Sequence, residues 1–305
     1  MDGQLLGETA ALGASVLWTF TSIAFTVASR KVGPLNVNMW RMAFALGLLA
    51  ITHIIVLGTL LPAANSAQWF YMGLSGIIGL ALGDLGYFGG LMILGPRRGT
   101  LLMATNPIFS ALTGAVVLGE MLSSWAVLGI GVTLFGVTLV VLEKQDGAEP
   151  ALTPRKNALG IVAGLVGSVG QGVGLVVSKY GMMDAATGDP LDPLSATLMR
   201  MVTASAFFFI AMLVMRKTRE MKSALGDREG MKATVAGTVL GPYLGVWIFM
   251  LAVSNAKAGV VATLGSLMPV FIIPVVYVLY RQKTSWRGVL GAVIAITGVA
   301  ILMLM

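Results

Sequence analysis

Ten apolar stretches, each long enough to cross a lipid bilayer as one helix, occupy most of this chain of 305 residues. A transmembrane helix needs about 20 mainly apolar residues, whereas transmembrane strands show short segments in which apolar and polar residues alternate. Only 11% of the residues are charged, compared with about 25% in soluble domains, so lipid must cover most of the surface. The sequence therefore predicts an all-α integral membrane protein with ten transmembrane helices. The predicted helices are 6–28, 35–57, 69–93, 99–118, 125–142, 158–177, 194–214, 233–253, 259–279 and 286–303.

The two halves of the chain share prolines, arginines and glycines at matching intervals. Pro34 is followed seven residues later by Arg41, and Pro193 is followed by Arg200 at the same distance. In a second set, a proline precedes two glycines, and the intervals between the three residues are the same in both halves. This set consists of Pro107, Gly129 and Gly136 in the first half and Pro269, Gly291 and Gly298 in the second. Recurring spacing of this kind indicates a duplicated unit.

Each predicted half contains five helices, an odd number, so the halves must enter the membrane in opposite orientations. Such inverted repeats are typical of secondary transporters. We expect the first five-helix repeat in residues 1–143 and the second in residues 158–305. The polar segment 144–157, which contains two prolines and a glycine, is expected to be the linker between them.

Basic residues separate strongly between the two faces of the predicted bundle. The loops after the odd-numbered helices carry sixteen of the 20 Lys and Arg residues, and the opposite loops carry two, Lys179 and Lys257. Loops rich in Lys and Arg stay in the cytoplasm, so we expect a multi-pass protein of the inner (plasma) membrane with both termini outside. The same topology explains the net charge of +7, so no nucleic-acid partner is expected.

The composition excludes several kinds of site. The chain has no cysteine and one histidine, His53, which excludes thiol catalysis, disulfides and metal sites made by cysteines or by several histidines. His53 lies near the end of the second predicted helix and is expected at the membrane interface. No phosphate-binding loop or nucleophile elbow is present. We therefore expect no enzyme activity, no metal and no cofactor.

Three ionisable residues lie well away from the ends of predicted helices, where a charge costs about 2.5–3.5 kcal/mol on insertion scales. Asp84 lies in a glycine-rich part of the third helix, GLALGDLGYFGG, and Arg41 and Arg200 are the repeated arginines. Asp84 is the strongest candidate for substrate binding or proton coupling. The alternatives are a structural ion pair with Arg41 or Arg200 and a protonated, hydrogen-bonded core carboxyl. The arginines are candidates for binding an anionic substrate group or for gating, or else they extend to the interface.

Aromatic and amide side chains inside the helices are further candidates for a substrate path. Rings can line a cavity and stack on a ligand, and the alternative role is helix packing. These candidates are Trp18, Tyr87, Asn106, Gln171, Tyr243 and Trp247. Three prolines in or next to helices, Pro107, Pro242 and Pro269, are candidate hinges.

Two acidic residues near helix ends are expected to be structural. Glu120 follows the fourth helix and is expected to stabilise the turn there, while the repeat places Gln282 at the corresponding position. Glu8 is expected to complement the N-terminus of the first helix, with proton coupling as the alternative. The position in the second repeat that corresponds to Asp84 is occupied by Pro242, so the predicted site is asymmetric.

Several segments carry a family resemblance. They are PLNVNMWRM in the second predicted helix, GDLGYF in the third, NPIFSALTGAVVLGEMLSSWAVLG across the fourth and fifth, and GQGVGLVVSKYGM in the sixth. The second copy is looser: PLSATLMRM fits well, and Gln282 stands where glutamate is common. These segments resemble the drug/metabolite transporter superfamily, specifically its EamA family. The resemblance implies a ten-helix basket in which helices 1–4 and 6–9 surround a central cavity and helices 5 and 10 lie outside.

The resemblance also implies a transporter that moves amino acids, other metabolites, sugar phosphates or organic cations by alternating access. We expect an exporter of a small amino-acid-like solute, organic cation or related metabolite, with protons as the candidate coupling ion, acting as a monomer or homodimer in the lipid bilayer. The alternatives are a channel-like facilitator and a non-transporting membrane scaffold or sensor. Relatives are commonly drawn with cytoplasmic termini, in contrast to the orientation that the basic residues predict here.

Overall fold

The computed structural model describes residues 3–142, 153–183, 190–216, 218–280 and 285–304, and these segments contain no β-strand. The first half contains α1 (Gly3–Val32), α2 (Pro34–Leu57), α3 (Ser66–Ser75), η1 (Gly76–Gly83), α4 (Asp84–Met103), α5 (Asn106–Val117) and α6 (Ser124–Val141). The second half contains α7 (Pro154–Met182), α8 (Pro193–Val214), α9 (Thr218–Ala224), α10 (Arg228–Thr238), η2 (Val239–Gly245), α11 (Val246–Asn255), α12 (Ala258–Gly265), α13 (Met268–Tyr280) and α14 (Trp286–Leu304). The predicted all-α membrane fold is confirmed.

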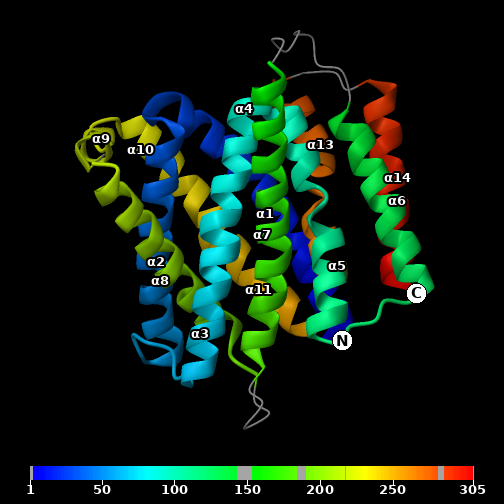
Figure 1. Cartoon of the computed structure of the whole chain (residues 1–305), viewed down its shortest axis with the longest axis horizontal. Coiled ribbons are helices and arrows are strands. Elements are labelled where there is room, and N and C mark those ends of the chain that lie inside the picture. The colour runs from blue at the N-terminus through cyan, green and yellow to red at the C-terminus, as the bar shows by residue number, and fades with distance from the viewer. Residues whose placement is uncertain (1–2, 143–152, 184–189, 217, 281–284, 305) are drawn as a thin grey trace.

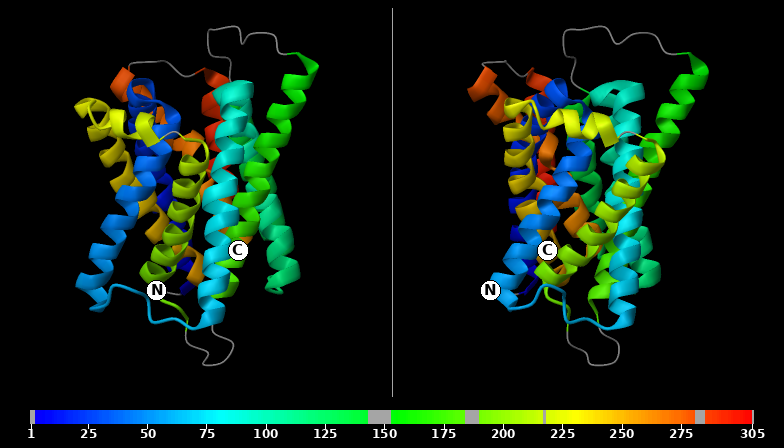
Figure 2. Two further views of the ribbon diagram at one scale, coloured as in Figure 1. Left: turned by 60° about the vertical axis from the view of Figure 1, so that its left-hand side comes forward. Right: turned by 90° about the vertical axis from the view of Figure 1, so that its left-hand side faces the viewer.

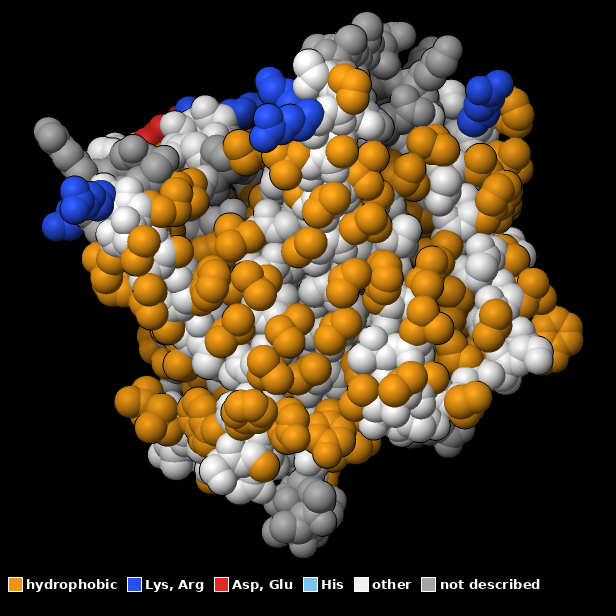
Figure 3. Space-filling model, in the orientation of Figure 1, with side chains coloured by type: hydrophobic (Ala, Val, Ile, Leu, Met, Phe, Trp, Pro, Cys, Tyr) orange, Lys and Arg blue, Asp and Glu red, His pale blue; other side chains and the backbone are white. Residues whose placement is uncertain are grey.

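Nine helical segments of the described chain are long and apolar enough to cross a membrane. The remaining predicted run, 99–118, contains a shorter apolar helix, Leu101–Val117, which falls short of a hydrocarbon core that is about 30 Å thick. The count of ten crossings therefore stays a prediction. Figure 3 shows hydrophobic side chains across the middle of the visible face and Lys and Arg gathered at one end, as expected for a protein that lipid surrounds.

Capping side chains fix where several helices begin. Asn65 and Gln68 form a reciprocal box at the start of α3: Asn65 Oδ1 accepts the Gln68 N–H at 2.8 Å, and Gln68 Oε1 accepts the Asn65 N–H at 3.0 Å. At the start of α8, Asp192 Oδ1 accepts the N–H groups of Leu194 at 2.9 Å and Ser195 at 3.1 Å. These bonds satisfy donors that the first turn of a helix leaves unpaired.

Two helices begin four or more residues earlier than the hydropathy pattern predicts. α7 begins at Pro154, because Thr153 caps its first turn and proline is favoured at the first helical position. The predicted linker 144–157 is therefore partly helical, and the part of it before Thr153 lies outside the described residues. α10 begins at Arg228 within a charged segment, because Asp227 caps its first turn.

The third and eighth predicted helices each contain a π-helical segment. η1 connects α3 to α4, and η2 connects α10 to α11. Both are rich in glycine, and η2 contains Pro242, which lacks a backbone N–H. Hydropathy predicts these regions as continuous helices, because it does not distinguish π-helical from α-helical backbone. π-Segments are rare and are frequent at functional sites.

The main helix contacts join the two halves of the chain. α1 packs along α10, η2 and α11 of the second half, and α7 packs along α3, η1 and α4 of the first. α2 packs against α8, α5 against α12, and α6 against α14. Figures 1 and 2 show the resulting bundle, and Figure 1 shows α6 and α14 side by side at one edge. This arrangement matches the expectation that the fifth and tenth helices lie outside.

Glycines bring the backbones of α6 and α14 into direct contact. A Cβ on Gly136 would lie 2.6 Å from Gly291 O, and a Cβ on Gly291 would lie 2.8 Å from Gly136 O. Gly129 and Gly298 meet in the same reciprocal way, at 3.1 Å and 2.8 Å. Small residues permit such close approach between membrane helices. These are the four repeated glycines of the sequence, and reciprocal contacts are those that a two-fold axis generates.

Gly136→Ala is expected to lower the free energy of unfolding by about 1–3 kcal/mol, because overpacking forces the helices apart. The new Cβ would lie 2.3 Å from Ala295 N. Gly131→Ala on the same helix is the matched control, because no other helix or side chain lies within 4 Å of that position. The control should keep or slightly raise stability. Thermal unfolding in detergent compares the two variants, and equal midpoints would contradict the importance of this contact.

Both ends of the chain lie at the same end of the bundle. Figures 1 and 2 place the N and C labels at the end opposite α9 and the start of α10. The Lys and Arg side chains visible in Figure 3 lie at the end of the bundle away from these labels. This separation agrees with the predicted topology, while the side of the membrane that each end occupies stays a prediction.

Candidate functional site

Asp84 lies at the centre of a buried charged cluster made by both halves. It is the first residue of α4, directly after η1, and its carboxylate forms an ion pair with Arg41 of α2. Gln171 of α7 donates a hydrogen bond from Nε2 to Asp84 Oδ1 at 2.8 Å. Asp84 is 9% exposed and Arg41 is 8% exposed. Three helices therefore converge on one carboxylate inside the bundle.

Arg200 of α8 is the second cation of this cluster. It is 3% exposed, and the negative charge of Asp84 acts on it. Its Nη1 donates to Met250 Sδ at 3.0 Å, which is a weak acceptor, and its Nε has no hydrogen-bond partner in the described part of the chain. A Cβ on Gly79 of η1 would lie 3.2 Å from Arg200 Nη2, so the missing side chain there gives the guanidinium its space.

Two aromatic rings contact Arg41. The centroids of Phe25 of α1 and Phe88 of α4 lie 5.7 Å and 5.2 Å from its guanidinium carbon. Cation–π attraction acts at such distances. Arg41 and Arg200 are both buried within the protein, and their depth in the membrane stays a prediction.

Three aromatic residues that the sequence suggested as site residues, Trp18 of α1, Tyr243 of η2 and Trp247 of α11, each contact another aromatic ring. The Tyr243 hydroxyl lies 2.7 Å from Thr52 Oγ1, and its ring centroid lies 6.2 Å from that of Trp247. The Trp18 ring centroid lies 4.8 Å from that of Phe249. Tyr243 and Trp247 also pack against a buried hydrophobic cluster. These contacts agree with a packing role, and a role in substrate binding stays a prediction.

Helix breaks occur beside two of the predicted hinge prolines. α4 ends before Thr105 and α5 begins at Asn106, so Pro107 lies in the first turn of a new helix. α12 ends before Ser266, and Pro269 lies in the first turn of α13. At each break a hydroxyl, of Thr105 or of Ser266, donates to the carbonyl three residues earlier at 2.7 Å. The breaks explain why both prolines are tolerated, because the first turn needs no N–H there.

Asn106 and Tyr87 complete the set of predicted site residues. Asn106 Oδ1 is buried without a hydrogen-bond partner in the described chain. Tyr87 is half-buried on α4, and its backbone lies against Gly167, where a Cβ would lie 2.6 Å from Tyr87 N. The roles of Asn106 and Tyr87 stay predictions.

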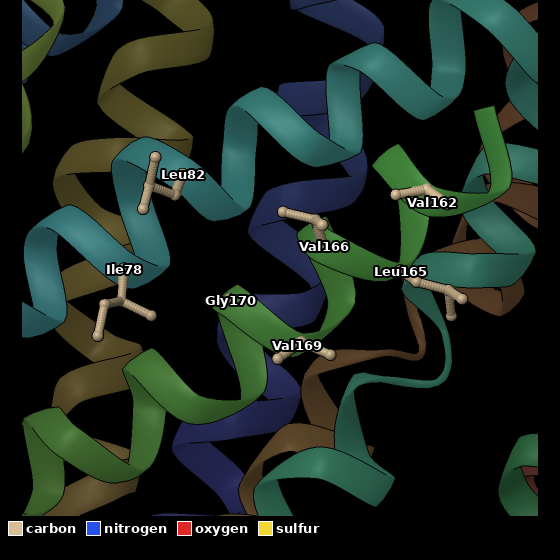
Figure 4. Close-up of a pocket in the computed structure, with 7 residues that line it drawn as sticks. All are labelled: Ile78, Leu82, Val162, Leu165, Val166, Val169 and Gly170. Atoms are coloured by element: carbon tan, nitrogen blue, oxygen red, sulfur yellow. The ribbon is translucent and has the colours of Figure 1, made fainter. Parts of the chain in front are cut away.

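A shallow apolar groove lies between η1 and α7. Its volume is about 360 Å³, and Figure 4 shows its lining side chains. The lining residues are Ile78, Leu82, Val162, Leu165, Val166, Val169 and Gly170. None of them is charged or polar, so the groove belongs to the apolar surface and not to the polar cluster around Asp84.

A second buried ion pair, which we name the terminal-face link, joins the halves near the ends of α5 and α7. The Lys179 ammonium pairs with the Glu120 carboxylate and donates to the Ala256 carbonyl. Glu120 Oε2 also accepts the Ala258 N–H at 2.7 Å. The sequence predicted a turn-stabilising role for Glu120, but its partners lie in the other half. Its predicted counterpart, Gln282, lies outside the described residues.

Glu8 and His53 lie near helix ends, as predicted from their positions, and both are buried. Glu8 is 2% exposed and accepts a hydrogen bond from Gln4 Nε2 at 2.9 Å. His53 is 1% exposed, with Nδ1 2.6 Å from Thr59 O and Nε2 3.0 Å from Ser195 Oγ. Contacts between helices cover both residues, and hydropathy along one helix does not report such contacts. In the described residues no three His, Asp or Glu side chains form a group that could hold a metal ion.

Comparisons with known proteins agree with this architecture. The sequence profile of the EamA-like transporter family matches residues 5–142 and again residues 158–304. The chain belongs to the EamA-like transporter family. This confirms the resemblance seen in the sequence motifs and establishes a multi-pass membrane protein.

Individual relatives of this EamA-family chain are distant. The uncharacterized transporter YyaM of Bacillus subtilis (strain 168) is 26% identical over 211 residues, which cover 68% of this chain and 64% of that relative. The chain therefore matches less than two thirds of the relative's length. A solved crystal structure superposes with a TM-score of 0.77 at 18% identity and covers 98% of this chain and 96% of that one. That likeness shows a shared fold.

Proposed function

We propose that this protein is a secondary transporter that exports a small polar or amphipathic metabolite across the inner membrane by alternating access. One observation carries the proposal: a buried charged cluster is assembled from both halves, with Arg41 and Asp84 from the first and Gln171 and Arg200 from the second. Transporters built from repeats bind their substrates between the repeats, next to interrupted helices. Here the π-segment η1 ends directly before Asp84.

The two halves are proposed to be inverted repeats, with both termini outside the cytoplasm. The reciprocal glycine contacts of α6 with α14 support the repeat. The matching contacts of α1 with the second half and α7 with the first also support it. The gathering of Lys and Arg at the end of the bundle opposite the termini supports the orientation. Labelling of a C-terminal tag only from the cytoplasm would contradict this orientation.

A carrier and a channel differ in how flux depends on concentration. We expect saturable counterflow when the purified protein is reconstituted in proteoliposomes, because each cycle of alternating access moves a limited number of solutes. The solutes to test are amino acids, other metabolites, sugar phosphates and organic cations, chosen first by a thermal-shift screen, since ligands that bind the native state raise its stability. Ohmic conductance without saturation would instead support the channel.

Asp84 is the proposed coupling group, with Arg41 and Arg200 as the charges that face it. We expect Asp84→Asn to reduce counterflow at least about tenfold and to remove the response of transport to a pH gradient, because the amide takes up no proton. Counterflow is measured with the wild-type and variant proteins at equal reconstituted amounts. Normal, pH-sensitive transport by Asp84→Asn would exclude this role.

A further inference from the structure

We infer that the solute carries an anionic group, a carboxylate or a phosphate, that pairs with Arg200. This inference rests on the proposed transport function and names the chemistry of its substrate. The buried cluster contains two guanidinium groups, of Arg41 and Arg200, and one carboxylate, of Asp84. Its charge is therefore not balanced. A buried charge without a partner is costly, and a substrate anion would balance it.

The carboxylate of Asp84 is already committed to other partners. One oxygen pairs with Arg41, and the other accepts the Gln171 hydrogen bond at 2.8 Å. Within the described chain, Arg200 forms no ion pair with any carboxylate. Asp84 is the acidic group whose charge acts on Arg200. A cationic solute would meet two guanidinium groups and a carboxylate that is already occupied, so the cluster disfavours it.

The guanidinium of Arg200 retains donors for an incoming anion. Its Nε has no partner, and its Nη1 donates to the sulfur of Met250, which any carboxylate or phosphate oxygen would replace as the stronger acceptor. The planar fork of arginine matches both kinds of anion in a bidentate geometry. Gly79 and Met250, which lie beside this guanidinium, are uncharged. No neighbouring charge in these contacts competes with the anion.

Matched pairs of probes test the inference by thermal shift of the purified full-length protein. Benzoate is compared with benzamide, L-phenylalanine with L-phenylalaninamide, and glycerol 3-phosphate with glycerol. We expect at least one anion to bind with a dissociation constant about ten- to a hundredfold lower than that of its neutral or amide partner, because a hydrogen bond to a charged group is lost in the partner. The carboxylate and phosphate arms distinguish the two anions.

Variants of Arg200 connect that preference to the site. Arg200→Gln should remove the difference between each anion and its partner without unfolding the protein, because the remaining Arg41 and Asp84 charges balance. Arg200→Lys keeps a cation but loses the fork and should show a reduced difference, and it serves as the second variant if Arg200→Gln does not fold. Arg228→Gln, which removes the same charge at an exposed position, should leave the preference unchanged.

Two outcomes would overturn the inference: no anion binds the wild-type protein more tightly than its partner, or the preference survives in Arg200→Gln. The same experiments distinguish failure of the proposed transport function from failure of the anion inference. An Arg200-dependent preference without counterflow of the same probe would leave anion binding in place and contradict the transport function. Counterflow of amides or amines in preference to acids would support transport and contradict the inference.

Discussion

Asp84→Asn is expected to lower the free energy of unfolding by about 3–5 kcal/mol, the range for removing one partner from a buried ion pair. The variant leaves the buried guanidinium groups of Arg41 and Arg200, both less than a tenth exposed, without the negative charge of Asp84. The ion pair with Arg41 and the hydrogen bond from Gln171 are lost or weakened together. Chemical or thermal unfolding in a mild detergent measures the change.

A double variant separates the charge effect from a simple loss of packing. Arg41→Gln together with Asp84→Asn removes both members of the pair and should recover part of the lost stability, with a coupling energy of about 0.5–3 kcal/mol. If the two single changes add without coupling, the ion pair does not stabilise the fold. The double variant also provides a folded protein without the carboxylate, in which the loss of transport is not explained by unfolding.

Lys179→Gln is expected to have an effect of similar size, about 3–5 kcal/mol, because it leaves the buried Glu120 carboxylate without its cation. Both side chains of the terminal-face link are at least 87% buried, with exposures of 9% and 13%. The same substitution in an exposed ion pair, Lys31→Gln opposite Glu229, is the matched control and should cost at most about 1 kcal/mol. Unfolding in detergent compares the two variants.

A double variant tests whether charge accounts for the effect at the terminal-face link. The link joins the connection between α5 and α6 to the end of α7 and the start of α12, so opening the bundle at this end requires its separation. Glu120→Gln combined with Lys179→Gln removes both charges and should recover stability relative to Lys179→Gln alone. If Lys179→Gln and Lys31→Gln lower the free energy of unfolding equally, the buried Lys179–Glu120 pair stabilises the fold no more than the exposed Lys31–Glu229 pair does.

The sequence was sufficient to find the residues of the charged cluster. Asp84, Arg41 and Arg200 stand out in one sequence, because each ionisable residue inside an apolar run is costly and therefore rare. Gln171 stands out among glycines for a similar reason. The pairing was not predictable, because it depends on which helices cross near Asp84, and the sequence left Arg41 and Arg200 as equal candidates. The structure pairs Asp84 with Arg41.

Residues at the ends of apolar runs were harder to interpret. Lys179 was counted as a loop residue from its position, yet it lies in α7 and is 7% exposed. Glu8 was assigned to a helix N-terminus and His53 to the interface from their positions alone, and both are also buried. Each is covered by segments distant in sequence, and a hydropathy window contains no information about such neighbours. The repeated glycines were noted only for their spacing, and the structure shows that they lie in the contact between α6 and α14.

The helix breaks at Thr105 and Ser266 affect how the bundle can bend. A broken helix inside a bilayer exposes carbonyl groups that lipid cannot hydrogen-bond. At both breaks a side-chain hydroxyl donates to such a carbonyl, at 2.7 Å in each case. The hydroxyl moves with the same turn as its acceptor, so the angle between the two helix segments can change while that bond persists. Tilting at these two points therefore leaves the Leu102 and Thr263 carbonyls paired, since each also accepts the backbone N–H of Thr105 or Ser266 at 3.1 Å.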